Sequence, residues 1–192
     1  MRLAPSLLLA ALALGCAKRA AAPAIAVPAT TTEIHCDGEL TEPPWRSPAR
    51  TGAFVDARGN AVAPYSEARF LRDAERLYVG LYAADQDIQS ATDAFVLTFA
   101  SDRGRATFSL SPRGEVTPPV AGLLVGADAD GTIDDSTDED EEWVVEAGFP
   151  LKALPIANDG TVEVEVSRCD TPHDGVRRCG AWKGRLSLPP AR

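Results

Sequence analysis

The chain has 192 residues, which is enough for one domain together with a leader and a linker. Hydrophobic residues make up 45% of it and charged residues 24%, which excludes a disordered chain and one that lies in a membrane throughout. The formal net charge of -9 excludes nucleic-acid binding through the phosphate backbone, because that mode of binding needs a basic surface.

The first residues have the pattern of an export signal. Arg2 supplies a positive charge, and residues 7–14 form an apolar run that is too short for a mature membrane-spanning helix. A glycine then precedes Cys16, and this ending resembles the lipobox of bacterial lipoproteins, although Ala13 stands where that motif usually has leucine. The resemblance predicts a signal peptide over residues 1–15 and lipid attachment at Cys16. The alternative is a plain secretory signal that is cleaved nearby.

The next segment predicts a tether. Residues 16–32 are rich in alanine and proline and show almost no hydrophobic periodicity. The lipoprotein resemblance implies an outer-membrane location, because Ala17 rather than an aspartate follows Cys16. We therefore expect the protein in the periplasm or at the cell surface, in contact with the membrane through its lipid anchor alone.

Short strands follow one another from residue 33 onward. In residues 76–85, Leu77, Val79 and Leu81 fall on one face at a period of two, which predicts a strand with an aliphatic, core-facing side. Further strands are expected at residues 54–56, 67–71, 93–99, 106–111, 123–125, 143–150, 162–167 and 182–188, with one helical turn at residues 151–154. Many short strands without crossover helices predict an all-β, antiparallel β-sandwich of jelly-roll or immunoglobulin-like architecture over residues 33–192.

Three cysteines follow Cys16, and export would place them in an oxidising compartment. Cys169 and Cys179 bracket a turn that contains proline and glycine, so a disulfide between them would close a short loop. Such a bond stabilises by about 2–3 kcal/mol. Pairing of Cys36 with either of them is the competing arrangement, and an unpaired Cys36 would behave as a small buried hydrophobe.

The order of several short motifs resembles that of carbohydrate-binding module family 9-like domains. Five segments carry the resemblance: residues 37–42 with Trp45 (D-G-x-x-D-E-x-x-W), residues 76–79 with Asp85 (L-Y-V and a trailing aspartate), residues 93–99 (D-x-V-E), residues 143–150 (W-x-x-E-x-x-x-P), and residues 166–168 with Trp182. Each motif alone is weak, and their order is the specific signal. The resemblance covers residues 33–188 and implies a β-sandwich. By the same resemblance, sugar contacts would fall at Trp182, Asp93 and Arg168.

The sequence departs from this family at its sugar site. The studied sugar-binding members hold a glycan end between two tryptophans, and one of these should precede the D-x-V-E strand. Residues 89–92 contain no aromatic residue, Val96 replaces the acid of that strand, and Ser109 replaces the arginine of the next. Trp182 alone is left as a platform. Its alternatives are core packing and covering of the disulfide, whereas Trp45 and Trp143 are expected in the core.

Other chemistry is sparse. The acidic residues 128–135 suit a hard cation such as calcium, but Gly126 and Thr137 occupy the first and last ligand positions of a helix–loop–helix calcium site. A solvated acidic loop is therefore favoured, and no other cofactor or metal is expected. Asp85 and Asp87 are interpreted as turn-capping residues. Neither a Ser-His-Asp signature nor a phosphate-binding glycine loop is present, so we expect no enzyme.

Two functional hypotheses follow. The first is a non-catalytic carbohydrate-binding module that holds glycan at the cell envelope, in support of polysaccharide catabolism. The second is an envelope protein that binds another protein or serves a structural role, on the same fold with the sugar site lost. An exposed Trp182 on a concave face would favour the first hypothesis, and a buried Trp182 the second.

Overall fold

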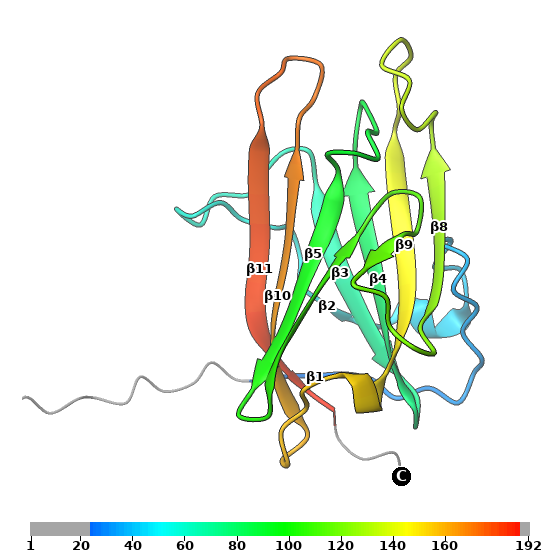
Figure 1. Ribbon diagram of the computed structural model, residues 1–192, viewed down its shortest axis with the longest axis vertical. Coiled ribbons are helices and arrows are strands. Elements are labelled where there is room, and N and C mark those ends of the chain that lie inside the picture. The colour runs from blue at the N-terminus through cyan, green and yellow to red at the C-terminus, as the bar shows by residue number, and fades with distance from the viewer. Residues whose placement is uncertain (1–23, 189–192) are drawn as a thin grey trace, which may run out of the picture.

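The computed structural model describes residues 24–188, which form two β-sheets packed face to face (Figure 1). The elements in chain order are β1 (Ile25–Ala26), η1 (Pro43–Arg46), β2 (Ala49–Arg50), β3 (Ser66–Arg72), β4 (Arg76–Ala84), β5 (Ala94–Ser101), β6 (Gly104–Leu110), β7 (Val116–Thr117), β8 (Leu124–Asp130), β9 (Glu142–Pro150), η2 (Leu151–Ala153), β10 (Thr161–Asp170) and β11 (Arg178–Ser187). One sheet has the strand order β1-β11-β10-β5-β6-β7 and the other β2-β3-β4-β9-β8. All pairs are antiparallel except β1 with β11. The predicted antiparallel β-sandwich is therefore confirmed.

The N-terminal part of the described chain is docked on the sandwich. Ile25–Ala26 pairs with the end of β11, and Val27 is 2% exposed in the main core. The predicted tether is thus in contact with the domain over its described residues. The predicted signal peptide and Cys16 lie outside the described residues. Among residues 24–188, no helix has the length and apolar character needed to cross a membrane.

The main core lies between the two sheets and has the faces that the alternation predicts. Leu77, Val79 and Leu81 of β4 are fully buried, as expected for its aliphatic side. In β10 the valines point inward, while Glu163 is exposed on the other side. Burial of these alternating aliphatic side chains is what drives the two sheets together.

A second, smaller core covers the outer face of the five-stranded sheet. It consists of the buried residues Ile34, Trp45, Leu71 and Tyr78. Residues 33–46, which we call the covering segment, therefore lie over β3 and β4. Trp45 is buried, as predicted, and its indole N–H donates a hydrogen bond of 2.9 Å to Glu146 of β9, which anchors the covering segment on the sheet.

Two strand predictions were wrong. β8 runs over seven residues instead of the predicted three, so the acidic loop begins only after Asp130. The strand was missed because it contains glycine, alanine and aspartate, which have low β-strand propensity. Gly126 is needed there because a Cβ would lie 2.1 Å from the carbonyl oxygen of Cys36 in the covering segment. The predicted strand at residues 54–56 is reduced to single bridges of Val55 with Ala61 and Ala181.

The predicted disulfide is confirmed. Cys169 and Cys179 stand directly opposite each other in the β10–β11 ladder and are bonded. Within residues 24–188, Cys36 has no disulfide partner, and it is half-buried. Burial raises the pKa of its thiol to about 12. The β10–β11 loop beyond this disulfide lies at the same end of the sandwich as the β8–β9 loop and the β4–β5 connection (Figure 1). This loop end holds the candidate site.

Candidate functional site

A hollow of about 660 Å³ opens at the loop end, and we call it the end pocket. It lies where β3 begins, β4 ends, the chain enters β9, and the β10–β11 loop folds over. Its lining residues are Ala63, Pro64, Tyr65, Ala84, Asp85, Gln86, Asp140, Glu141, Pro172, His173, Asp174 and Arg178. The pocket thus combines an aromatic ring and two prolines with several carboxylates, which is the mixed lining that small-molecule sites use.

Tyr65 is the aromatic residue of this pocket and is 42% exposed. Its ring centroid lies 6.0 Å from that of Tyr82, and its hydroxyl donates a 3.0 Å hydrogen bond to Glu67. Glu67 is buried and also accepts hydrogen bonds from Arg50 and Arg69. The hydroxyl is therefore held at a fixed point, while a large part of the ring remains open to solvent.

Charged groups of the β10–β11 loop form the rim of the pocket. Arg178 pairs with Asp174 at 2.5 Å, and these two side chains are half-exposed. His173 places its Nδ1 atom 3.5 Å from a carboxylate oxygen of Asp87. Glu141 and Asp140, from the segment before β9, also belong to the lining. The pocket is therefore lined by charged groups from two separate parts of the chain.

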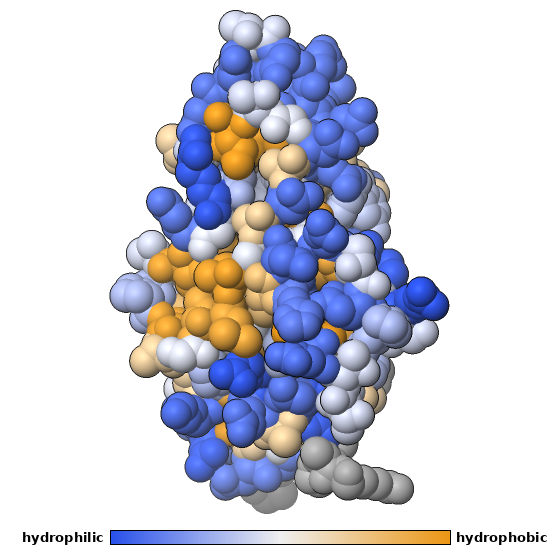
Figure 2. Space-filling view, turned by 90° about the vertical axis from the view of Figure 1, so that its right-hand side faces the viewer, coloured by the Kyte–Doolittle hydropathy of each residue, from blue (hydrophilic) through white to orange (hydrophobic). Residues whose placement is uncertain are grey.

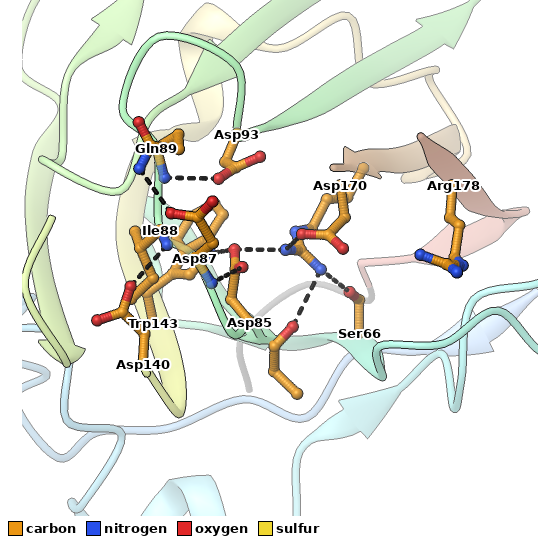
Figure 3. Close-up of polar contacts among 12 residues, drawn as sticks. Ser66, Asp85, Asp87, Ile88, Gln89, Asp93, Asp140, Trp143, Asp170 and Arg178 are labelled. Atoms are coloured by element: carbon orange, nitrogen blue, oxygen red, sulfur yellow. Dashed lines mark hydrogen bonds and ion pairs between the residues drawn. The ribbon is translucent and has the colours of Figure 1, made fainter. Parts of the chain in front are cut away.

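A buried ion-pair network adjoins the pocket at Asp85, which belongs to both (Figure 3). Arg168, 4% exposed, donates from Nη2 to Asp85 at 2.6 Å and to Asp170 at 2.7 Å. Its Nη1 atom donates to the hydroxyl of Ser66 and to the carbonyl of Ala84, both at 3.2 Å. The network therefore joins β10 of one sheet to β3 and β4 of the other.

Trp143 of β9 contacts two members of this ion-pair network. Its indole N–H donates a 2.9 Å hydrogen bond to Asp85, and its ring lies 5.7 Å from the guanidinium of Arg168. The same ring packs 4.9 Å from that of Phe95 in the core. Trp143 is fully buried, as predicted, and it orients the carboxylate of Asp85 in addition to filling space.

Asp93 lies beside this network and is 1% exposed. One of its oxygens accepts a 2.7 Å hydrogen bond from the backbone N–H of Gln89. Burial raises the pKa of Asp93 to about 7. Burial also raises the pKa of Asp170, to about 6, although the neighbouring Arg168 opposes the shift.

The three predicted sugar-contact residues do not lie at one site. Asp93 and Arg168 come together beneath the end pocket, whereas Trp182 does not line it. Trp182 is half-buried and stands opposite the buried Val166, so its side chain faces the sheet interior. Its ring lies 6.1 Å from that of Phe70 and covers Gly184. Core packing was the alternative for this residue, and the contacts agree with it.

The remaining predicted positions lie elsewhere. Val96 and Ser109, the substitutes for the family's acid and arginine, stand opposite each other on the outer face of the six-stranded sheet. Farther along this face is a smaller hollow of about 300 Å³, and its lining includes the paired Lys183 and Glu165 but no aromatic residue. Figure 2 shows a different face, on the β8 side, where apolar atoms gather; Leu124 and Val125 of β8 are about 40% exposed.

The acidic loop that suggested calcium does not gather ligands. Among residues 24–188, three acidic ligand groups come together at Asp85, Asp93 and Asp170 and not within residues 128–135. Asp134 instead binds Ser90 and Arg113. The loop carboxylates therefore tie loops together. Sequence reasoning had singled out Asp85 by its motif, but nothing in the local sequence marked Tyr65 or Arg178 as pocket residues.

Comparisons with known proteins bear on the fold. No family model and no curated protein matches the sequence. The structure is similar to a carbohydrate-binding module family 9 domain from Caldicellulosiruptor kristjanssonii in complex with cellotriose, with a TM-score of 0.65 and 13% identity, covering 88% of this chain and 95% of that one. A family 9 module from the same organism in complex with glucose gives a TM-score of 0.64 and 13% identity, covering 88% and 97%. The chain therefore has the β-sandwich fold of carbohydrate-binding module family 9 domains, as the order of its motifs predicted.

Proposed function

We propose that this protein is a non-catalytic carbohydrate-binding module and that the end pocket is its glycan site. The observation that carries the proposal is a hollow of about 660 Å³ that is lined both by Tyr65, which is 42% exposed, and by polar side chains. An aromatic face covers the apolar C–H side of a pyranose, while carboxylates and amides bind its hydroxyls. The likeness of the fold to modules with bound cellotriose and glucose supports the same reading.

The polar groups of the pocket are arranged to orient such a ligand. Gln86 and Glu141 contribute an amide and a carboxylate to the lining, and Asp174 and Arg178 contribute an ion pair. The pocket volume lies within the range of ordinary small-molecule sites. The fold likeness is to binding modules, which supports a role in holding glycan without cleaving it.

The same proposal includes the cellular setting. With lipid on Cys16, the module would be held at the outer membrane and would keep glycan near the envelope, where degrading enzymes act. Replacing Cys16 with serine is expected to move the protein from the membrane fraction to the soluble fraction. Retention of the variant in the membrane fraction would contradict the lipid anchor.

The glycan site is tested with a glycan array followed by calorimetry on the full chain, purified in detergent. We expect saturable binding to at least one glycan class. Tyr65→Ala should weaken it about tenfold or more, which corresponds to about 1.4 kcal/mol. The matched control is Trp182→Phe, which keeps an aromatic ring at the interior position and should leave binding unchanged.

The opposite effects of these two substitutions on glycan binding would refute the end pocket as the glycan site. If Trp182→Phe weakens binding and Tyr65→Ala does not, the site lies at the sheet and not in the end pocket. A folded protein that binds no glycan contradicts the function itself. The interior position of Trp182 would then favour the second hypothesis, an envelope protein that binds another protein, and capture of a partner from the envelope would be the next experiment.

A further inference from the structure

Negative charge is in excess beneath the end pocket. Five carboxylates there are at most 9% exposed: Asp85, Asp87, Asp93, Asp140 and Asp170. Within residues 24–188, Arg168 is the buried cation that accompanies them. A buried carboxylate without compensation is costly, so this excess calls for a counter-charge or for protonation.

The outer two of these acids are satisfied by their surroundings. Asp140 accepts backbone N–H groups on both oxygens, from Ile88 at 2.7 Å and from Thr132 at 2.6 Å. Asp87 accepts the side-chain amide of Gln89 and faces His173. The imbalance is thereby confined to the inner three acids, which share one guanidinium and carry two surplus negative charges when all are ionised.

One oxygen of the inner group has no partner. Oδ2 of Asp170 is buried and accepts no hydrogen bond from any group within residues 24–188, and the residue as a whole is 3% exposed. Its other oxygen is held by Arg168. An unpaired buried carboxylate oxygen is rare in folded proteins and calls for an explanation, such as a bound ion, a water molecule or a proton.

The geometry of the group suits a hard cation. Asp85, Asp93 and Asp170 each offer an oxygen, and these oxygens lie within 4.8 Å of one another. Calcium binds oxygens at about 2.3–2.6 Å, so two of its ligands can lie up to about 5 Å apart. Carboxylate ligands without histidine or cysteine favour calcium over zinc or copper. The bonds from Trp143 and Arg168 to Asp85 would fix the ligand in place, as outer contacts do in metal sites.

We propose that Asp85, Asp93 and Asp170 bind one calcium ion directly beneath the end pocket. The two positive charges of the ion match the surplus of the three carboxylates, and the ion gives the free oxygen of Asp170 a partner. It joins the end of β4, the start of β5 and the end of β10. Because Asp85 also lines the end pocket, the ion stiffens that part of the lining. The site does not depend on whether the pocket binds glycan.

The test uses the full chain after treatment with EGTA and removal of the chelator. Calcium chloride is expected to raise the melting temperature by about 5–10 °C at a concentration a hundredfold above its Kd. Elemental analysis after gel filtration in calcium should give one calcium per chain. Magnesium chloride should raise the melting temperature less, because Mg²⁺ demands a tighter, near-ideal octahedral site.

Two variants locate the ion. Asp93→Asn removes a charged ligand, retains an acceptor for the N–H of Gln89, and should weaken the calcium effect tenfold or more. In EGTA this variant should be at least as stable as the native chain, because it lacks one buried charge. The matched control is Asp135→Asn in the exposed acidic loop, which should respond to calcium as the native chain does.

Three results would overturn the proposal. Calcium without effect on the melting temperature and absent from the eluted protein would mean that a proton, rather than a metal ion, compensates the cluster. A calcium response that survives Asp93→Asn but disappears in Asp135→Asn would place the ion in the acidic loop. An equal response to calcium and magnesium in the native chain and in both variants would indicate diffuse binding to an acidic surface.

Discussion

Glu146 is predicted to make the stability of the domain depend on pH. This residue of β9 is fully buried beneath the covering segment. One of its oxygens accepts the indole N–H of Trp45, and the other has no hydrogen-bond partner in the part of the chain that the structure describes. Burial raises the pKa of Glu146 from 4.5 to about 7, and the charge of Glu42 adds to the shift. The folded chain therefore holds a proton more tightly at this site than the unfolded chain does.

The sign and size of the effect follow from linkage. Because the folded pKa is raised, the favourable contribution is fully present below about pH 4.5 and is lost as the pH rises through 7. The shift corresponds to about 3 kcal/mol of unfolding free energy at most. Glu146→Gln keeps an oxygen for Trp45 and removes the charge. The variant should match the native chain near pH 5 and exceed its stability by up to about 3 kcal/mol at pH 8.

The measurement is urea denaturation at pH 5, 6, 7 and 8, followed by tryptophan fluorescence. Both proteins are measured in EGTA, so that titration of other buried acids such as Asp93 cancels in the difference. The control is Glu163→Gln, the same substitution at an exposed position of β10. A flat difference curve for Glu146→Gln, or a loss of stability at pH 8, would refute the reasoning.

Two further predictions concern the packing of the sandwich. Replacing both Cys169 and Cys179 with serine should lower the unfolding free energy by about 2–3 kcal/mol in urea, and an unchanged midpoint would show that the loop is already constrained without the bond. Gly126→Ala should cost about 1–3 kcal/mol by calorimetry, because its Cβ would lie 2.1 Å from the carbonyl oxygen of Cys36. If the melting temperature of this variant equals that of the native chain, the covering segment is not packed on β8 as described.

The faces of the strands could be predicted because they depend on local order alone. Leu77, Val79 and Leu81 occupy every second position of β4. Because side chains of a strand alternate between its two faces, this spacing places all three on the same face. The disulfide was also within reach, because a short turn brings Cys169 and Cys179 opposite each other. In both cases the relevant neighbours are close in sequence.

β8 and the end pocket could not be predicted in the same way. The covering segment, which is far away in the sequence, packs so closely on β8 that no side chain fits at Gly126. Tyr65 lines a pocket because residues of the β10–β11 loop, and Arg178 at the start of β11, form other parts of its lining. Neither residue carries a pattern in its own neighbourhood, so tertiary contact alone decides its role.

The motif residues that predicted the fold carry little information about the ligand, because most of them have structural roles. Trp45 binds Glu146, Trp143 binds Asp85, and Asp85 binds Arg168, so the quoted motifs meet as buried polar pairs that join strands and sheets. Such pairs are costly to break on one side, because the remaining partner is left buried and unsatisfied. Their order therefore marks the sandwich, whatever it binds. In the proposed glycan site, ligand specificity would lie instead with the exposed loop residues of the end pocket, which can change without loss of these pairs.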